Sequence, residues 1–504
     1  MPRLSGFCSG YYQSQSPNFS AATCLNWYPE QAEIPEAKSP VALYPTPGTR
    51  FVCQLPSSIG TGGPALGIAN CYGVFYAADA TSAYAIASPA FTPVLIGTFA
   101  GTSLNPVSIV CNNAHQVIFC AGGELYIYDT LTTTFTHVAT NITATGDKFA
   151  KVRFIDGYFL ATVRFSQKFY ISAVEDGTSW NGLDFGLIST FSENIVDFEV
   201  LQRQIWFFGG NNATAYYNSG NPNFPFEPIQ GAYIEKGAVG GDLVADLTYT
   251  AVVMDNTIYW MGTDQRGSLT AWKLQGYTPA RISNSAVENQ WRDTNISGTT
   301  FPVKAYTYQE NGHIFYVVNL PNPAPSTDHT TWAYDSLTGQ WHQRGQFNSS
   351  QIIVGQDFTA HAWGYNKHMV VGAAFGYIYD QNIDYTTYDS LLIPRIRRAP
   401  YVSAAGERIS YQRFRLDMET GLVDTGTLPP PQVSLRWSDD NGHTWSNYHQ
   451  VGAGALGQYA YRVLWRRLGQ DRFNGRVFEV SCSDNISLRL VDAYVDASPA
   501  QAAA

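Results

Sequence analysis

The stretch SDDNGHTW, residues 438–445, brings hydroxyl and carboxylate side chains together at a spacing that could support catalysis. Its pattern is Ser438-x-Asp440-x-Gly442-x-Thr444-Trp445. The Asp440 carboxylate can accept backbone N–H groups across a tight turn, and Gly442 supplies a position that tolerates positive φ. Trp445 supplies a ring that can be buried behind the hairpin. The pattern therefore predicts a structural hairpin made by these five residues.

The same pattern is the Asp-box that decorates the blades of sialidases and other β-propellers, so a sialidase-like, glycan-active propeller enzyme is the alternative interpretation. Such an enzyme needs an arginine cluster for the substrate carboxylate and a tyrosine nucleophile working with a glutamate. The chain has one full Asp-box; its nearest echo, AVEDGTSW at 173–180, departs from the pattern at Ala173, Glu175 and Ser179. No Arg-Ile-Pro motif stands near the N-terminus. We expect a hairpin here, and no catalytic residues.

Other motifs give no support for a cofactor or a metal. GAGALG at 452–457 fits G-x-G-x-x-G, but it lies in a β-rich region where a dinucleotide site would need a βαβ unit, so we expect a loop. The nine histidines form no H-E-x-x-H motif, and G-x-S-x-G is absent. The seven cysteines are odd in number and include no C-x-x-C pair, which predicts free thiols.

Arginine is concentrated near the C-terminus. Residues 391–480 contain twelve Arg, no Lys and eight acidic residues, a balance of +4, whereas the rest of a chain with net charge −10 carries −14. Two groups stand out: Arg395, Arg397, Arg398 and Arg462, Arg466, Arg467. Because Arg suits desolvated ion pairs at interfaces, we predict a partner-binding surface. Ion pairing within the domain is the alternative.

The elements that must position these residues are strands. Aromatic residues make up 14% of the chain and charged residues 14%, and short apolar bursts alternate with Gly, Asn and Asp, which is typical of all-β proteins. Tight turns are expected at Asp79–Ala80, Gly122–Gly123, Asp156–Gly157, Gln202–Arg203, Asp255–Asn256, Asn311–Gly312 and Asn366–Lys367. Their spacing of about 34–56 residues predicts a β-propeller of six or seven blades over 55–392.

Three further segments flank the propeller. Residues 1–54 are Pro-rich and show no clear periodicity, so we expect an extended arm without a strand ladder, lying on the C-terminal module or on a neighbour. Residues 393–497 alternate in short strands and predict a β-sandwich-like platform or docking module. Residues 498–504 are expected to be a disordered tail. The most apolar stretch, AIASPAFTPVLIGTFAG, is too short and Pro-interrupted to span a membrane.

Several separate segments resemble one family. They are YNSG-NP-FPFE-QGA-IEKG at 217–237, YW-G…G-W at 259–272, GYTP-RIS at 276–283, RFSQKFYISAVEDGTSWNGLDFG at 164–186, LRWSDDNGHTWSN at 435–447, YRVLWRRLGQDRFNGRVFEV at 461–480 and NWYPE…SP…YPTPGTR at 26–50. In this order they resemble the packaged-DNA stabilisation proteins, or tail hub (nozzle) subunits, of short-tailed bacteriophages.

The resemblance implies a structural, non-enzymatic component of the virion tail, made in the bacterial host cytoplasm. It implies a homo-hexamer below the portal and its adaptor that closes and lines the DNA exit channel, with a tail spike or fibre and a plug or needle as further partners. Packaged DNA would pass through the lumen without sequence-specific binding, and no cofactor is expected. Net negative charge suits a channel that repels phosphates, so we hypothesise that acidic residues line the lumen and that the Arg-rich module faces the adaptor. A monomeric kelch-like binding module is a third interpretation, but it leaves the arm and the C-terminal module without a purpose.

Overall fold

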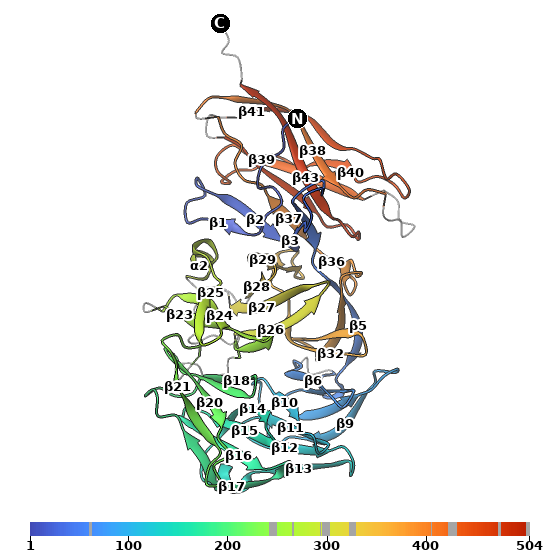
Figure 1. The fold of residues 1–504 in the computed structure, drawn as a ribbon. Helices are drawn as coiled ribbons and strands as arrows, with labels where there is room; N and C mark the ends of the chain where they lie inside the picture. The colour runs from blue at the N-terminus through green and yellow to red at the C-terminus, as the bar shows by residue number, and fades with distance from the viewer. Residues whose placement is uncertain are drawn as a thin grey trace.

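The computed structural model describes residues 1–59, 63–240, 249–264, 267–292, 294, 303–321, 329–404, 406–421, 431–471 and 475–499. Within these ranges the chain is almost entirely strand and turn. A β-propeller lies at one end of an elongated molecule and a β-sandwich at the other, where the C-terminus also lies (Figure 1). The predicted all-β fold, with a propeller and an additional C-terminal sandwich, is confirmed.

Five propeller blades are separate antiparallel sheets of four consecutive strands. Blades 1 and 2 contain β6 (Gly67–Cys71), β7 (Val74–Ala78), β8 (Ser82–Ile86), β9 (Pro93–Thr98), β10 (Ser108–Cys111), β11 (Gln116–Ala121), β12 (Glu124–Asp129) and β13 (Thr134–Val138). Blades 3 and 4 contain β14 (Phe149–Ile155), β15 (Tyr158–Val163), β16 (Lys168–Ala173), β17 (Asp176–Leu187), β18 (Asp197–Leu201), β19 (Gln204–Phe208), β20 (Ala213–Asn218) and β21 (Phe226–Ile234). Blade 5 contains β22 (Val252–Met254), β23 (Thr257–Thr263), β24 (Leu269–Gln275) and β25 (Thr278–Arg281).

The last two blades join the propeller to the rest of the chain. Blade 6 contains β26 (Lys304–Glu310), β27 (His313–Pro321), β28 (His329–Asp335) and β29 (Gln340–Arg344). Blade 7 contains β32 (Phe358–Gly364), β33 (Lys367–Gly372) and β34 (Tyr377–Asn382), and its fourth strand is β5 (Gly48–Gln54) from the N-terminal region. The first strands of neighbouring blades contact one another around a closed ring. The number of blades is therefore seven, and a strand near the N-terminus completes the last one.

Six of the seven hairpin turns expected from sequence have a pair of positive-φ residues at the expected position or within one residue of it, whereas Asp79–Ala80 lies between β7 and β8 without positive φ. Gly122–Gly123, Asp156–Gly157, Gln202–Arg203, Asp255–Asn256 and Asn311–Gly312 all have positive φ at both residues. That conformation is the one that joins two twisted antiparallel strands, and Gly, Asn and Asp adopt it most readily. In blade 7 the two positive-φ residues are Tyr365 and Asn366, so the turn lies one residue earlier than expected.

The prediction that residues 1–54 form an extended arm without a strand ladder is wrong. The segment contributes β1 (Tyr12–Gln13), β2 (Ala21–Leu25), β3 (Trp27–Gln31) and β4 (Val41–Pro45) in addition to β5. Pro29 is accommodated because β3 is the edge strand of its sheet, where a missing N–H costs no hydrogen bond on the open side. Trp27, which is fully buried, anchors this segment in the sandwich core.

The sandwich packs two sheets around one core. One sheet has the order β3-β4-β43-β38-β41 and the other contains β2-β37-β42-β39-β40. The strands not yet bounded are β37 (Arg395–Arg398), β38 (Ile409–Met418), β39 (Gln432–Ser438), β40 (His449–Gly452), β41 (Val463–Gln470), β42 (Val477–Cys482) and β43 (Leu490–Pro499). β43 includes residues 498 and 499, which were predicted to begin a disordered tail; residues 500–504 lie outside the described residues.

One sheet runs through both halves of the molecule. β29 of blade 6 pairs in parallel with β2, and β2 pairs with β37 of the sandwich, so blade 6 and one sandwich sheet are hydrogen-bonded into a single ten-stranded sheet. The propeller and the sandwich are therefore joined through backbone hydrogen bonds as well as through the covalent chain. The small elements are η1 (Pro56–Ser58), α1 (Thr140–Thr143), α2 (Ser285–Trp291), β30 (Gln346–Phe347), β31 (Ile353–Val354), β35 (Thr387–Tyr388) and β36 (Leu391–Leu392).

Candidate functional site

The Asp-box is a closed hairpin turn at the end of β39. Asp440 Oδ1 accepts the Thr444 backbone N–H at 2.7 Å and the Ser438 hydroxyl at 2.7 Å, and the Gly442 N–H donates to Ser438 Oγ at 2.8 Å. Gly442 has φ +90°. Hydrogen bonds from the Thr444 side chain and backbone lower the pKa of Asp440 to about 2. The structure therefore contains the predicted hairpin, and the Asp440 carboxylate is hydrogen-bonded within the turn.

Trp445 departs from the expectation that its ring is buried behind the hairpin. Its Nε1 donates to the Gly442 carbonyl at 3.1 Å, but the side chain is only partly buried. The guanidinium groups of Arg398 and Arg436 lie 5.0 and 4.7 Å from its ring centroid. Both arginines also form ion pairs with Glu479, a fully buried carboxylate. The hairpin is thus fastened to the sandwich by a cation–π and ion-pair network, and Arg398 belongs to it.

Arg397 was predicted to bind a partner, and the structure corrects this. Its side chain is fully buried, and its guanidinium binds the N-terminal segment of the same chain. Nε donates to the Phe7 carbonyl at 2.6 Å, Nη2 to the Gly6 carbonyl at 3.0 Å, and Nη1 to the carbonyls of Gly10 and Thr23 at 3.1 and 3.0 Å. The sequence placed this side chain at the junction between two domains but could not show that the first residues of the chain fold around it.

Arg395 is also a buried residue and does not face a partner. It is 1% exposed, and Nη1 donates to the Asp484 carbonyl at 3.4 Å. Its Nε and Nη2 atoms have no hydrogen-bond partner among the described residues. Burial lowers the pKa of this guanidinium. Arg395, Arg397 and Arg398 therefore bond within the chain, which was the alternative to a partner-binding surface.

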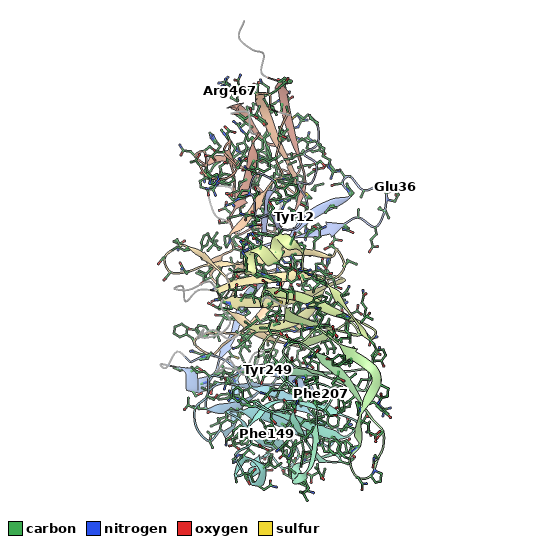
Figure 2. All side chains as sticks on the ribbon, turned by 90° about the vertical axis from the view of Figure 1, so that its left-hand side faces the viewer. Tyr12, Glu36, Phe149, Phe207, Tyr249 and Arg467 are labelled. Carbon is green, nitrogen blue, oxygen red and sulfur yellow. The ribbon has the colours of Figure 1, made fainter. Side chains whose placement is uncertain are left out.

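Arg462, Arg466 and Arg467 are placed differently. They lie on or beside β41, the edge strand of its sheet, and all three are exposed. In the part of the chain that the structure describes, none of their side chains makes an ion pair or hydrogen bond. Figure 2 shows Arg467 at the end of the molecule opposite to the propeller residue Phe149. This group remains available to a partner.

A buried histidine connects the N-terminal segment to the propeller, and the sequence reasoning missed it. His313 of β27 is 1% exposed; its Nδ1 lies 2.8 Å from Asp335 Oδ2 of β28, and its Nε2 lies 2.6 Å from Glu30 Oε2 of β3. Burial opposes a charge on the ring, but the hydrogen bonds and charges of Asp335 and Glu30 outweigh it, so the pKa of His313 is raised. We call these three residues the junction clasp.

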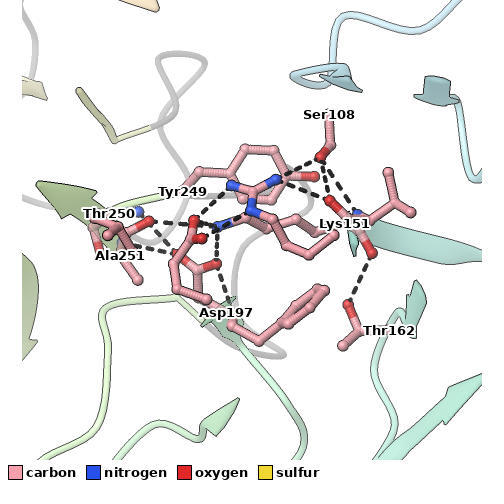
Figure 3. Close-up of polar contacts among 12 residues, drawn as sticks. Ser108, Lys151, Thr162, Asp197, Tyr249, Thr250 and Ala251 are labelled. Carbon is pink, nitrogen blue, oxygen red and sulfur yellow. Dashed lines mark hydrogen bonds and ion pairs between the residues drawn. The ribbon is translucent and has the colours of Figure 1, made fainter. Parts of the chain in front are cut away.

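A second buried cluster ties the blades together near the propeller axis (Figure 3). Lys151 of blade 3 is 2% exposed, and its Nζ donates to Asp197 Oδ1 at 2.6 Å and to Glu199 Oε1 at 2.7 Å, both of blade 4. Asp197 also accepts the Ala251 N–H of blade 5 at 2.9 Å. Burial would raise the pKa of Glu199, but Arg153 and Lys151 outweigh it and lower the pKa to about 2. The hydrogen bonds of this cluster join blades 3, 4 and 5.

Other classes of site receive no support from the described residues. Within the described ranges, no group of three or more His, Cys, Asp or Glu is placed to hold a metal ion. No described helix is long and apolar enough to cross a membrane. The seven cysteines are free thiols. GAGALG begins at Gly452, the last residue of β40, and residues 453–457 form a loop, as predicted for the motif.

Solved structures match the chain only at low sequence identity and with TM-scores below 0.5. A chain of the mitotic checkpoint complex has 12% identity and a TM-score of 0.40, covering 70% of this chain and 96% of that one. The N-terminal domain of Nup159 has 11% identity and a TM-score of 0.39, covering 72% and 99%. BamB from Moraxella catarrhalis has 10% identity and a TM-score of 0.36, covering 66% and 99%. No curated protein matches the chain.

Two family models match the chain, and together they span nearly all of it. The model described as bacteriophage P22 Gp10, beta-propeller, matches residues 6–373. The model described as bacteriophage P22 Gp10, beta-sandwich, matches residues 394–498. The descriptions of the two models, a beta-propeller and a beta-sandwich, agree with the two parts of the structure. The chain belongs to the Gp10 family, phage tail structural proteins that stabilise packaged DNA.

Proposed function

We propose that the chain is a subunit of a homo-hexameric tail hub, or nozzle, that attaches below the portal–adaptor assembly of a short-tailed phage. The hub closes and lines the DNA exit channel, anchors tail spikes or fibres, and contacts a plug or needle at its far end. The observation that carries this proposal is the match of the Gp10 models to both the propeller and the sandwich. The role is structural and non-enzymatic.

The connections within the chain support a structural role under the pressure of packaged DNA. The propeller is closed by β5 from the N-terminal region, and blade 6 shares a sheet with the sandwich. The junction clasp and the Arg397 hydrogen bonds hold the first residues against the same junction. A subunit with such connections keeps its shape when packaged DNA presses on it, because its two halves cannot separate without breaking buried polar contacts.

The distribution of charge supports one orientation. Residues 391–480 carry a balance of +4 and the remainder −14. Arg467, one of the exposed arginines of β41, lies at the sandwich end (Figure 2), so that end faces the adaptor. Acidic residues of the remaining chain face the lumen, where they repel phosphates and let the genome pass without binding.

The experiment that tests the proposal is quantitative mass spectrometry of purified phage particles, comparing the copy number of this chain with that of the portal subunit. A ratio near one to two fits six hubs below a twelve-subunit portal. Absence from the particle, or trace amounts, would reject the hub. A fluorogenic sialoside assay on the purified chain tests the glycan-active alternative, and we expect no hydrolysis.

A further inference from the structure

The outer face of the β3-β4-β43-β38-β41 sheet places two arginines directly opposite each other. Arg466 on β41 is in register with Arg413 on β38, and both are exposed. Side chains opposite each other across an antiparallel pair have Cβ atoms about 4.5–5.5 Å apart, and like charges there destabilise the pair. For its own stability the chain would have an acidic or neutral residue at one of these positions.

The two arginines of β38 on this sheet, Arg413 and Arg415, have partners within the chain. Arg413 donates from Nε and Nη2 to Asp496 Oδ2 at 3.0 and 2.7 Å. Arg415 stacks on Tyr494, with its guanidinium carbon 4.3 Å from the ring centroid. Arg466 has no ion pair with any residue that the structure describes. The excess positive charge on this face is therefore located on Arg466 and its neighbours in β41.

The loop that leads into β41 is exposed from residue 455 onward. Every residue from 455 to 462 is exposed, including Leu456 at 61%, Tyr459 at 73% and Tyr461 at 40%. Exposed tyrosines beside arginines are characteristic of the residues that dominate binding energy at protein–protein interfaces. A surface that only bound DNA phosphates would need the basic groups but not the apolar ones.

We propose that the 455–467 surface, meaning this loop together with the first residues of β41, docks a protein partner through carboxylates on that partner. Arg462, Arg466 and Arg467 pair with those carboxylates, and Tyr459 and Leu456 pack against apolar groups between them. The partner's acidic groups give Arg466 the counter-charge that Asp496 already gives Arg413 within the chain. Charge complementarity identifies the partner as acidic; that the portal adaptor is this partner rests on the proposed function.

The decisive variant is Arg466→Glu, because stability and binding should change in opposite directions. Glutamate opposite Arg413 makes an attractive pair, so we expect the melting temperature of the sandwich to be unchanged or higher. Binding to immobilised poly-L-glutamate, measured by biolayer interferometry at low salt, should weaken about tenfold. Arg462→Glu, in the loop, should weaken it to a similar extent. Arg292→Glu, an exposed arginine beside α2 in the propeller, is the matched control and should leave binding unchanged.

The same variants are then measured with the purified portal–adaptor complex and with duplex DNA. Loss of poly-L-glutamate and adaptor binding in Arg466→Glu, with full binding in Arg292→Glu, supports the inference. Equal poly-L-glutamate binding by all the proteins overturns it, even if wild type still binds the adaptor. Tighter binding to duplex DNA than to poly-L-glutamate also overturns it, in favour of a phosphate-binding surface. If wild type binds poly-L-glutamate through Arg466 but does not bind the adaptor, the surface stands and the adaptor part of the proposed function fails.

Discussion

The junction clasp can be tested by replacing His313 with glutamine. The histidine ring lies between the carboxylates of Asp335 and Glu30, with both nitrogens within 2.8 Å of an acidic oxygen. When both carboxylates are ionised, both ring nitrogens must donate, so the ring is positively charged. His313→Gln keeps a polar side chain of similar reach but removes the charge and one of the two donors.

The expected loss of stability follows from burial. His313 is 1% exposed and Asp335 is fully buried, so the variant leaves a carboxylate in the interior without its cation. Removing one partner of a buried ion pair costs about 3–5 kcal/mol. The Glu30 side chain is 30% exposed, so Glu30→Gln should cost about 1 kcal/mol or less. Glu30→Gln is the control, because it removes the partly solvated contact and keeps the buried one.

The effect also has a defined dependence on pH. The pKa of His313 is raised above its unfolded value of about 6.5, so the stabilisation is fully present below about pH 6.5 and is lost as the pH rises through the folded pKa. Over that window the advantage of wild type over His313→Gln should fall by about 1.4 kcal/mol per pH unit. Burial lowers the pKa of His361 to about 3 and of His368 to about 4, but both rings are present in both proteins and their contributions cancel.

The assay is native-state hydrogen exchange of the amides of β3 and β27, measured between pH 6 and pH 9 and corrected for the intrinsic exchange rate. We expect the free energy of local opening in β3 to fall in the variant at pH 6 and to approach that of wild type at high pH. Blades 2 to 4, which do not contact the clasp, serve as an internal reference. If His313→Gln protects β3 as well as wild type does at pH 6, or if the difference does not shrink with rising pH, the charged clasp is not what holds this strand.

Three other substitutions have clear expected outcomes. Arg397→Met should free the N-terminal segment that the guanidinium binds, so the buried Cys8 thiol should react with a thiol reagent at least tenfold faster in a time course. Asp440→Ala should destabilise the sandwich by about 1–2 kcal/mol in urea unfolding without creating or removing any hydrolytic activity, because its carboxylate only caps a turn. Lys151→Met should leave Asp197 buried without its cation and lower propeller stability by about 3–5 kcal/mol, measured by differential scanning calorimetry; a change below about 1 kcal/mol would contradict that role.

Local features of this protein were predictable because they depend on neighbours in sequence. The Asp-Gly, Asp-Asn and Asn-Gly turns adopt the positive-φ pairs that their residue types favour, and the spacing of these turns indicated the propeller. The Asp-box hairpin was predictable for the same reason, since Ser438, Asp440 and Thr444 bond within seven residues. The free thiols, the loop at 452–457 and the separate C-terminal sandwich also followed from short motifs and composition.

Contacts between distant segments were decided by the tertiary structure. β5 completes blade 7 by pairing with β34, more than 300 residues away, and nothing in the Pro-rich N-terminal sequence marks it as a propeller strand. Arg397 resembles the arginines of β41 in sequence, yet it is buried because the first residues of the chain wrap around it, whereas Arg466 is exposed because β41 is an edge strand. His313 shows no motif, and its charge arises only where two other strands bring acidic groups to it. Whether an ionisable side chain is bonded within the chain or left for a partner depends on packing between segments, and local sequence does not contain that information.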